Sequence, residues 1–186
     1  MRYFIALPLP EELKQEISKL QSQLKETQAD VKWVNSKDLH ITLKFLGGIE
    51  QEKVETISEK LNRGLDGFLP FTFTIGEIGS FPSLESPKVI WIGVEKNRER
   101  VVELAEKVEE LLKTLGFSHE RRPFHPHLTL GRIRSRKQIG ELIRKLKSLK
   151  IPEFRPVEVE RVILFQSILK PEGPEYKILR EFKLKL

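Results

Sequence analysis

The tetrapeptide His-x-Thr-Leu occurs twice in the chain, at residues 40–43 and 127–130. The two copies lie 87 residues apart in a chain of 186 residues that contains only four histidines. On a β-strand the side chains of residues i and i+2 share a face, so each copy would present an imidazole and a hydroxyl together. Two such strands side by side would bring two imidazoles and two hydroxyls to one groove.

This set of side chains suits chemistry at phosphorus. In an in-line displacement the attacking and leaving oxygens lie on opposite sides of the phosphorus, so one side needs a base and the other an acid. Histidine serves either role near neutral pH because its unperturbed pKa is about 6.5. Threonine hydroxyls can donate strong hydrogen bonds to charged phosphate oxygens. We therefore expect His40 and His127 to be the acid–base pair and Thr42 and Thr129 to hold the phosphate, with no metal required.

The two other histidines are weaker candidates for chemistry. His125 lies two residues before His127 and could form a metal-binding pair with it. Pro126 interrupts the strand between them, and the chain has no cysteine, so the sequence argues against a metal site. His119 stands beside a predicted helix end and is expected on the surface.

Basic residues are concentrated directly after the second motif. Segment 132–150 contains eight Lys or Arg residues and one acidic residue, Glu141. Such a run is typical of a solvated helix face, but its position modestly favours a polymeric anion over a mononucleotide as the partner. Strict alternation places Arg132 on the face opposite His127, away from the phosphate. A β-bulge at Gly131 would turn it back toward the groove, and without one Arg132 is a surface residue at the end of the strand; the sequence favours neither alternative.

Two residues after the first motif have alternative interpretations. Alternation places Lys44 on the same face as His40, where it would attract phosphate or stand at the groove rim. Phe45 could stack on a base, but alternation favours packing in the core.

Hydrophobic periodicity predicts the elements that must position these residues. Helices are expected where apolar residues recur every three or four positions, at 11–28, 51–65, 97–116 and 137–149. Strands are expected at 2–9, 31–34, 39–47, 71–81, 88–95, 125–133, 157–169 and 176–186. Each motif strand is followed by a helix and then by two strands, at offsets near 85 residues, which indicates an internal duplication.

The duplication predicts an α+β fold with two lobes related by a pseudo-twofold axis. Two antiparallel sheets would face a central groove, with helices on the outer faces. No Gly/Ser-rich linker separates the halves, so residues 1–186 are expected to form one two-lobed domain.

Composition restricts the partners and the compartment. The net charge of +6 and the pI of about 9.5 favour an anionic partner such as nucleic acid or phosphate. No apolar run is long enough to span a bilayer, and the N-terminal residues are interpreted as a strand rather than a signal peptide. The absence of cysteine favours the cytoplasm. Nothing in the sequence indicates a cofactor or an obligate protein partner.

The stretches LHITLKFLG (39–47) and FHPHLTLGRI (124–133) resemble the paired motifs of the two-histidine (2H) phosphoesterase superfamily. Within that superfamily they are most similar to the RNA 2',3'-cyclic phosphodiesterases, also described as the 2'-5' RNA ligase family. The resemblance covers essentially the whole chain, including RYFIALPLP (2–10) and FPSLESPKVIWIGV (81–94).

The resemblance implies a bilobal fold and a metal-independent hydrolysis of a terminal 2',3'-cyclic phosphate of RNA or a nucleotide to a 2'-phosphate. It implies that His40 donates a proton to the leaving 3' oxygen and that His127 accepts a proton from water. Thr42 and Thr129 match phosphate-binding threonines, and Arg132 matches a basic position that helps to hold the phosphate. The residue pattern alone cannot assign the two histidine roles, because it is symmetric.

Two other functions fit the same motifs. A 2'-5' RNA ligase would join the cyclic phosphate to a 5'-hydroxyl by the same acid–base pair. A non-catalytic protein would only bind RNA ends, although histidine at both motif positions argues against it.

Overall fold

The computed structural model describes residues 1–186 and contains every predicted helix and strand. The helices are α1 (Glu11–Lys25), α2 (Gln51–Gly64), α3 (Arg98–Lys113) and α4 (Ile139–Ser148), and a 3-10 turn, η1 (Ser36–Asp38), precedes the first motif. The strands are β1 (Arg2–Pro8), β2 (Val31–Trp33), β3 (His40–Gly47), β4 (Phe71–Phe73), β5 (Ile75–Pro82), β6 (Pro87–Val94), β7 (His127–Ile133), β8 (Val157–Val159), β9 (Arg161–Lys170) and β10 (Gly173–Lys183). Two segments predicted as single long strands are each divided, into β4 and β5 and into β8 and β9.

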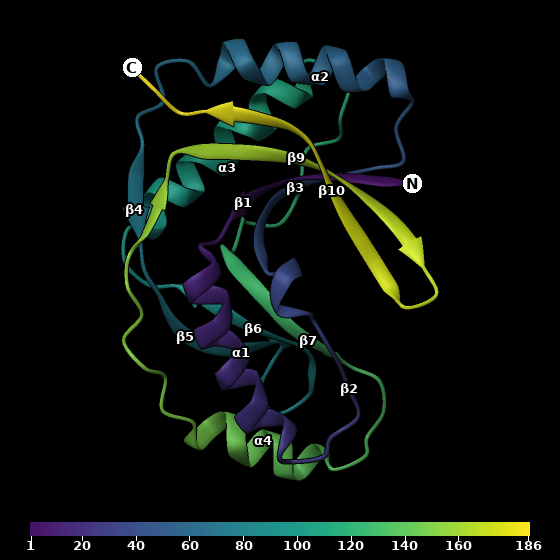
Figure 1. The fold of residues 1–186 in the computed structure, drawn as a ribbon, viewed down its shortest axis with the longest axis vertical. Helices are drawn as coiled ribbons and strands as arrows, with labels where there is room; N and C mark the ends of the chain where they lie inside the picture. Colours follow the sequence, from purple (N-terminus) through teal and green to yellow (C-terminus); the bar gives the residue numbers. More distant parts are fainter.

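The main strands form an antiparallel path in the order β10-β9-β1-β3-β7-β6-β5, with β2 paired to β7. Strands β3 and β7 meet at one residue pair, Ile41 and Leu128, so the path divides there into two four-stranded sheets. We call β1, β3, β9 and β10 with α2 and α3 the terminal lobe, and β2, β5, β6 and β7 with α1 and α4 the inner lobe (Figure 1). The predicted α+β class and the two antiparallel sheets are confirmed.

The two lobes repeat one arrangement of strands and exchange parts of the chain. The order β9-β1-β3 in the terminal lobe corresponds to β5-β6-β7 in the inner lobe. Strand β5 comes from the first half of the chain but completes the inner lobe, whereas β9 comes from the second half and completes the terminal lobe. Neither half of the chain can therefore complete a lobe alone.

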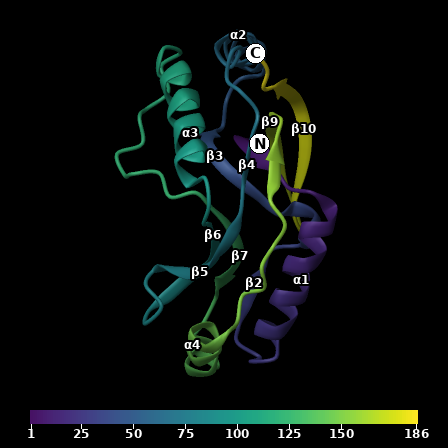
Figure 2. The same cartoon turned by 90° about the vertical axis from the view of Figure 1, so that its left-hand side faces the viewer.

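Each lobe has its own helix layer. In Figure 2, α3 flanks the terminal lobe on one side and α1 flanks the inner lobe on the other. The inward faces of these helices supply fully buried apolar residues such as Ile17 of α1 and Leu104 and Val108 of α3. Burial of this apolar surface is the main term that holds helices on a sheet. No helix has the length and apolarity that crossing a membrane would need.

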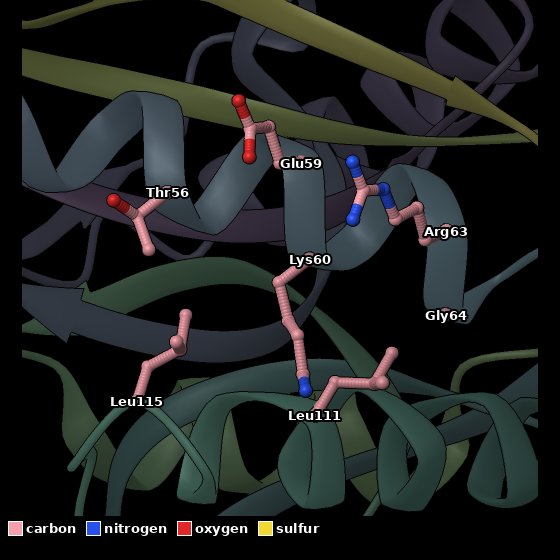
Figure 3. A pocket seen from close by; sticks show the side chains of 7 residues that line it. All are labelled: Thr56, Glu59, Lys60, Arg63, Gly64, Leu111 and Leu115. Atoms are coloured by element: carbon pink, nitrogen blue, oxygen red, sulfur yellow. The ribbon is translucent and has the colours of Figure 1, made fainter.

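Helices α2 and α3 pack closely on the outside of the terminal lobe. A Cβ atom added to Gly64 would lie 2.3 Å from the side chain of Leu111, so a larger residue here would require Leu111 to move. A hollow of about 340 Å³ lies between the two helices, where Lys60 reaches toward α3 (Figure 3). None of the motif residues lines this hollow, so the candidate site lies elsewhere.

Candidate active site

The pair that joins the two lobes also brings the two motifs together. Ile41 and Leu128 are fully buried and face the core. In an antiparallel pair with this register, each motif histidine lies across from the threonine of the other motif. All four of these side chains point away from the core and are partly exposed. The predicted alternation is confirmed, and the four polar groups share one face of the paired strands, which we call the groove face.

Both motif histidines are oriented by the same backbone contact. His40 Nδ1 lies 2.6 Å from the carbonyl oxygen of Asp38, and His127 Nδ1 lies 2.5 Å from that of His125. Because a carbonyl oxygen only accepts hydrogen bonds, each Nδ1 must carry a proton and donate it. In the neutral imidazole the lone pair is then on Nε2. Both rings therefore direct Nε2 to the groove, where it accepts a proton when neutral and donates one when charged.

The first motif also contains a direct contact between its two polar residues. His40 Nε2 lies 3.0 Å from Thr42 Oγ1. When His40 is neutral, Nε2 accepts the hydroxyl proton of Thr42. When His40 is protonated, Nε2 donates to the hydroxyl oxygen, and the hydroxyl proton becomes available to another acceptor. The protonation state of His40 thus decides where Thr42 donates.

Aromatic rings surround His40 in the terminal lobe. The ring of Phe4 stacks on the imidazole at a centroid distance of 4.8 Å, and Tyr176 contacts it edge-on at 5.3 Å. Burial in this environment lowers the pKa of His40 to about 4; the hydrogen bond to Asp38 opposes this change, and the charge of Lys14 adds to it. The free protein therefore holds His40 neutral at pH 7.

His127 has a comparable environment in the inner lobe. Phe81 contacts its imidazole edge-on at 5.0 Å, and the Trp91 ring lies at 6.2 Å. Burial is the main cause that lowers the pKa of His127, and the charges of His125 and Arg132 act in the same direction. A base with a lowered pKa is unprotonated at neutral pH, which is the state that takes a proton from water.

A β-bulge follows the second motif on β7. Neighbouring residues of β6, Ile90 and Trp91, pair with Gly131 and Thr129, which leaves Leu130 as the extra residue. An extra residue reverses the alternation of the side chains that follow it. Of the two alternatives for this point of the chain, a bulge that turns Arg132 and a surface arginine at a strand end, the structure contains the bulge.

Arg132 lies beyond the bulge and pairs with Val89 of β6. Val89 is two residues before Trp91 and so shares its face of the strand, and the ring of Trp91 faces the groove beside His127. Arg132 is therefore on the groove face, as a bulge beside Gly131 requires. Burial is the main cause that lowers the pKa of His127 and raises the pKa of Tyr176. In both residues the charge of Arg132 acts to lower the pKa. The guanidinium thus acts on groups of both lobes.

The bulge is held by the buried side-chain amide of Gln21, a residue outside both motifs. Gln21 Nε2 donates to the carbonyl oxygens of Leu130 and Val34, each at 2.9 Å, and the Gln21 side chain is 2% exposed. A buried polar group needs such partners, since an unpaired one costs about 1–3 kcal/mol. The sequence indicates a buried role for Gln21, because this amide lies on the apolar face of α1 between Leu20 and Leu24.

A matching bulge follows the first motif on β3. Neighbouring residues of β1, Ile5 and Ala6, pair with Lys44 and Thr42, which leaves Leu43 as the extra residue. Leu43 and Leu130 occupy the same place in the two copies of the motif. The duplication therefore includes the irregularity of the strand as well as its polar residues.

The first bulge overturns the expectation for Lys44. Because Lys44 pairs with the fully buried Ile5, it faces α3 instead of sharing the face of His40. Its amine donates to Glu109 Oε1 and to the carbonyl oxygen of Ser118, both at 2.7 Å. The prediction that Lys44 attracts phosphate or lines the groove rim is wrong, because this lysine is already paired.

The same bulge overturns the expectation for Phe45. Its side chain is 70% exposed, so the prediction of core packing is wrong. Phe45 pairs with Phe4, whose ring stacks on His40, and the two phenyl rings lie 6.2 Å apart. Phe45 is therefore on the groove face of the terminal lobe.

The remaining histidines contact neither motif threonine. The ring of His125 packs against Trp91 at 4.7 Å, and its Nδ1 has no hydrogen-bond partner. No group of three or more His, Cys, Asp or Glu that could hold a metal ion is present. The side chain of His119 is 65% exposed, as predicted for a surface residue.

About half of the basic segment 132–150 forms an amphipathic helix, which carries three of its eight Lys and Arg residues. Helix α4 lies at one end of the inner lobe (Figure 1) and buries Leu142 and Leu146. Three of its cations are paired with nearby carboxylates: Arg144 with Glu141, Lys145 with Glu26, and Lys147 with Glu85. This pattern agrees with a solvated helix face.

Comparisons with known proteins agree with the geometry. The model of LigT-like phosphoesterases matches the chain twice, over residues 7–91 and 92–176, which fits the predicted offset near 85 residues. An RNA 2',3'-cyclic phosphodiesterase of Methanocaldococcus jannaschii is 38% identical over 185 residues, covering 98% of this chain and 100% of that protein. One of Thermotoga maritima is 37% identical over 183 residues, covering 97% and 94%. The crystal structure of E. coli LigT complexed with 3'-AMP matches with a TM-score of 0.81 at 26% identity, covering 100% of this chain and 98% of that one.

Proposed function

Because the chain belongs to the family of LigT-like phosphoesterases, we propose that it hydrolyses the terminal 2',3'-cyclic phosphate of RNA to a 2'-phosphate without a metal. The observation that carries this proposal is the pair of histidines that direct Nε2 into one groove with two threonines. An acid, a base and hydroxyl donors around one phosphate are the groups that in-line hydrolysis needs. The names of the relatives support the substrate class.

In the proposed reaction His127 Nε2 takes a proton from water as the water oxygen attacks phosphorus. The bond between phosphorus and the 3' oxygen breaks, and His40 Nε2 gives its proton to that oxygen. The products are a 2'-phosphate and a 3'-hydroxyl. Each turnover leaves His127 protonated and His40 neutral, so one proton must return from the first ring to the second through solvent.

Thr42, Thr129 and Arg132 hold the non-bridging phosphate oxygens in this scheme. Once His40 is protonated, its Nε2 no longer accepts from Thr42, so the hydroxyl proton of Thr42 is available to the phosphate and the Nε2 proton is available to the leaving 3' oxygen. Protonation of the acid and binding of the phosphate therefore favour each other. The negative phosphate also raises the lowered pKa of His40, since an opposite charge stabilises the imidazolium.

We predict that kcat/KM is bell-shaped in pH with its maximum below 6.5. The pKa of free His40 is about 4 and that of His127 is lowered from 6.5, and the reactive form has a proton on the former only. Above both pKa values the reactive fraction falls about tenfold per pH unit. The kcat profile should lie at higher pH, because bound phosphate raises both pKa values. Initial rates between about pH 4 and 9 test this; a steady climb to alkaline pH would contradict the acid–base pair.

The direct test of the function uses an RNA oligomer that ends in a 2',3'-cyclic phosphate, with and without EDTA. We expect equal rates in both conditions and a 2'-phosphate as the product, identified by phosphorus NMR. A 3'-phosphate product would contradict the 3' oxygen as the leaving group, and loss of activity in EDTA would contradict metal independence. A parallel reaction with a 5'-hydroxyl RNA detects ligation, which would favour the ligase alternative.

We further propose RNA ends as the substrate and the cytoplasm as the compartment. The net charge of +6 and the position of Arg132 in the groove support a polyanionic substrate. The absence of cysteine supports a reducing compartment.

A further inference from the structure

Two cations face each other across neighbouring strands of the inner lobe. Strand β2 lies beside the second half of β7 (Figure 1), and Lys32 of β2 pairs directly with Arg132 of β7. Residues that are directly opposite in an antiparallel pair have their side chains on the same face of the sheet. Lys32 therefore lies on the groove face with Arg132, and both side chains are exposed.

Neither of these two cations has a charge partner in the protein. On α4 of the same lobe, Lys145 and Lys147 each lie within ion-pair distance of a carboxylate. No ion pair of the protein includes Lys32 or Arg132. Like charges that are directly opposite in a strand pair destabilise it. An anion bound beside both side chains would offset this repulsion, so the pair indicates an anion site that extends beyond Arg132.

The groove face carries the opposite charge near the start of β7. Glu77 of β5 pairs with Gly93 of β6, and Gly93 pairs with His127, so these three residues share the groove face. A Cβ atom added to Gly93 would lie 3.6 Å from Glu77 Oε2, so the carboxylate lies over the glycine. Along β7 the groove face therefore changes from a carboxylate near His127 to the two cations at Arg132.

This polarity gives a bound RNA chain one direction. The terminal nucleotide has the cyclic phosphate on its 3' side and a phosphodiester on its 5' side, one ribose away. When the cyclic phosphate lies at the motif residues, the phosphodiester is attracted toward Lys32 and repelled by Glu77. The partners of Thr129 and Arg132 on β6 are two residues apart, so the cation pair begins about 7 Å along β7 from Thr129.

We propose that Lys32 binds the phosphodiester on the 5' side of the terminal nucleotide, so that the RNA chain leaves the groove face across β2. This inference rests on the proposed function. Arg132 stays with the cyclic phosphate and stands between the two anions. The subsite distinguishes an RNA end from a mononucleoside 2',3'-cyclic phosphate, which has no phosphodiester to place there. Because the contact is to the backbone, it holds the end without selecting its sequence.

The test compares Lys32→Gln with the wild-type protein on two dinucleotides that end in the same adenosine 2',3'-cyclic phosphate. One has an ordinary phosphodiester between its nucleosides, and the other has a neutral methylphosphonate. Both carry a 2'-O-methyl group on the 5' nucleoside, so that only the terminal cyclic phosphate reacts. On the phosphodiester substrate we expect kcat/KM to fall about 2- to 5-fold in the variant, the range of one exposed ion pair. The loss should be in KM with kcat kept, since the contact is equal in the ground and transition states.

On the methylphosphonate substrate Lys32→Gln and the wild type should be equal. Two further variants control this comparison. Lys32→Arg keeps the cation and should keep the wild-type kcat/KM on both substrates. Lys60→Gln makes the same change of charge in the hollow between α2 and α3, outside the groove face, and should change nothing (Figure 3). An equal loss of kcat/KM on both substrates in Lys32→Gln, or no loss on either, would overturn the second phosphate site.

A binding measurement separates this inference from the proposed function. A single-stranded oligomer that ends in a 2'-phosphate mimics the product, and its Kd is measured by fluorescence anisotropy at several salt concentrations. Each phosphate contact contributes about 0.7 to the slope of log Kd against log salt for a single strand, so Lys32→Gln should lower the slope by about this amount. Lys60→Gln should keep the wild-type slope. An unchanged slope in Lys32→Gln would overturn the inference even if hydrolysis is observed. Failure of the wild type to hydrolyse either dinucleotide would instead refute the proposed function.

Discussion

Alanine in place of His127 is expected to lower kcat by a factor of about 100 to 10,000, and alanine in place of His40 by a similar factor. Each substitution removes one of the two Nε2 atoms that face the groove, while the threonines that hold the phosphate remain. The loss should therefore be mainly in kcat, with substrate binding kept. The double variant should be little worse than either single variant, because groups that act as a unit are not additive. His119→Ala removes an imidazole outside the groove whose side chain is 65% exposed; because its Nδ1 lies 3.8 Å from Glu109 Oε1, this control is compared with the wild type in stability as well as in kcat.

A modified substrate distinguishes the roles of the two histidines. When sulfur replaces the 3' bridging oxygen of the cyclic phosphate, the leaving thiolate departs without a proton, since the pKa of a thiol is only about 8.5. His40→Ala should then recover most of the lost rate, whereas His127→Ala should not. The opposite pattern would assign the acid to His127. Equal losses of both variants on both substrates would contradict the separate acid and base roles.

The sequence was sufficient to predict that the histidines and threonines of the two motifs share one face. Alternation in the two motifs placed the histidines and threonines on one face, because one face of each motif strand is apolar and must face the core. The bulge beside Gly131 was one of the two alternatives that the sequence left open. Glycine within a strand often marks a bulge or a close approach of other atoms, and an added Cβ at Gly131 would lie 2.6 Å from Val31.

The bulge at Leu43 had no such signal, and two predictions failed there. Its sequence, Leu-Lys-Phe, alternates as an ordinary strand does, so Lys44 was assigned to the groove and Phe45 to the core. The irregularity lies in the pairing with β1, which belongs to a different part of the chain. Pairing across such a distance is a tertiary property that local periodicity cannot specify.

Neither the backbone contacts of the two histidines nor the exchange of strands between the lobes could be predicted from the sequence. The carbonyl groups of Asp38 and His125 orient the two imidazoles, and a main-chain group has no residue signature. The element order predicted two lobes but not that β5 and β9 would each complete the lobe of the other half of the chain. A strand pairs with an edge whose backbone groups and apolar face are still uncovered by the rest of the chain. Which edges are uncovered depends on the whole fold.

The pair formed by Lys44 and Glu109 links the two motifs, and its loss should be the most destabilising single change near the groove. Lys44 lies on the first motif strand, two residues after Thr42. Ser118 and Glu120 lie in the loop that leads to the second motif. The carbonyl oxygen of Ser118 accepts a hydrogen bond from the Lys44 amine at 2.7 Å. The backbone N–H of Glu120 donates to Glu109 Oε1 at 2.9 Å. One ion pair therefore holds the loop of the second histidine against the strand of the first.

Lys44→Met is expected to lower the free energy of unfolding by about 2–4 kcal/mol, measured by urea denaturation. The lysine and glutamate side chains are only 10% and 14% exposed, so removal of the cation leaves a largely buried carboxylate whose remaining basic neighbour is the exposed His119, 3.8 Å away. Combining Lys44→Met with Glu109→Leu should recover much of the loss, because the unpaired charge is then gone. Lys170→Met is the control, since its pair with Glu175 is half exposed and should contribute at most about 1 kcal/mol. If Lys44→Met is as mild as this control, the pair does not hold the loop, and the packing around His127 must position it instead.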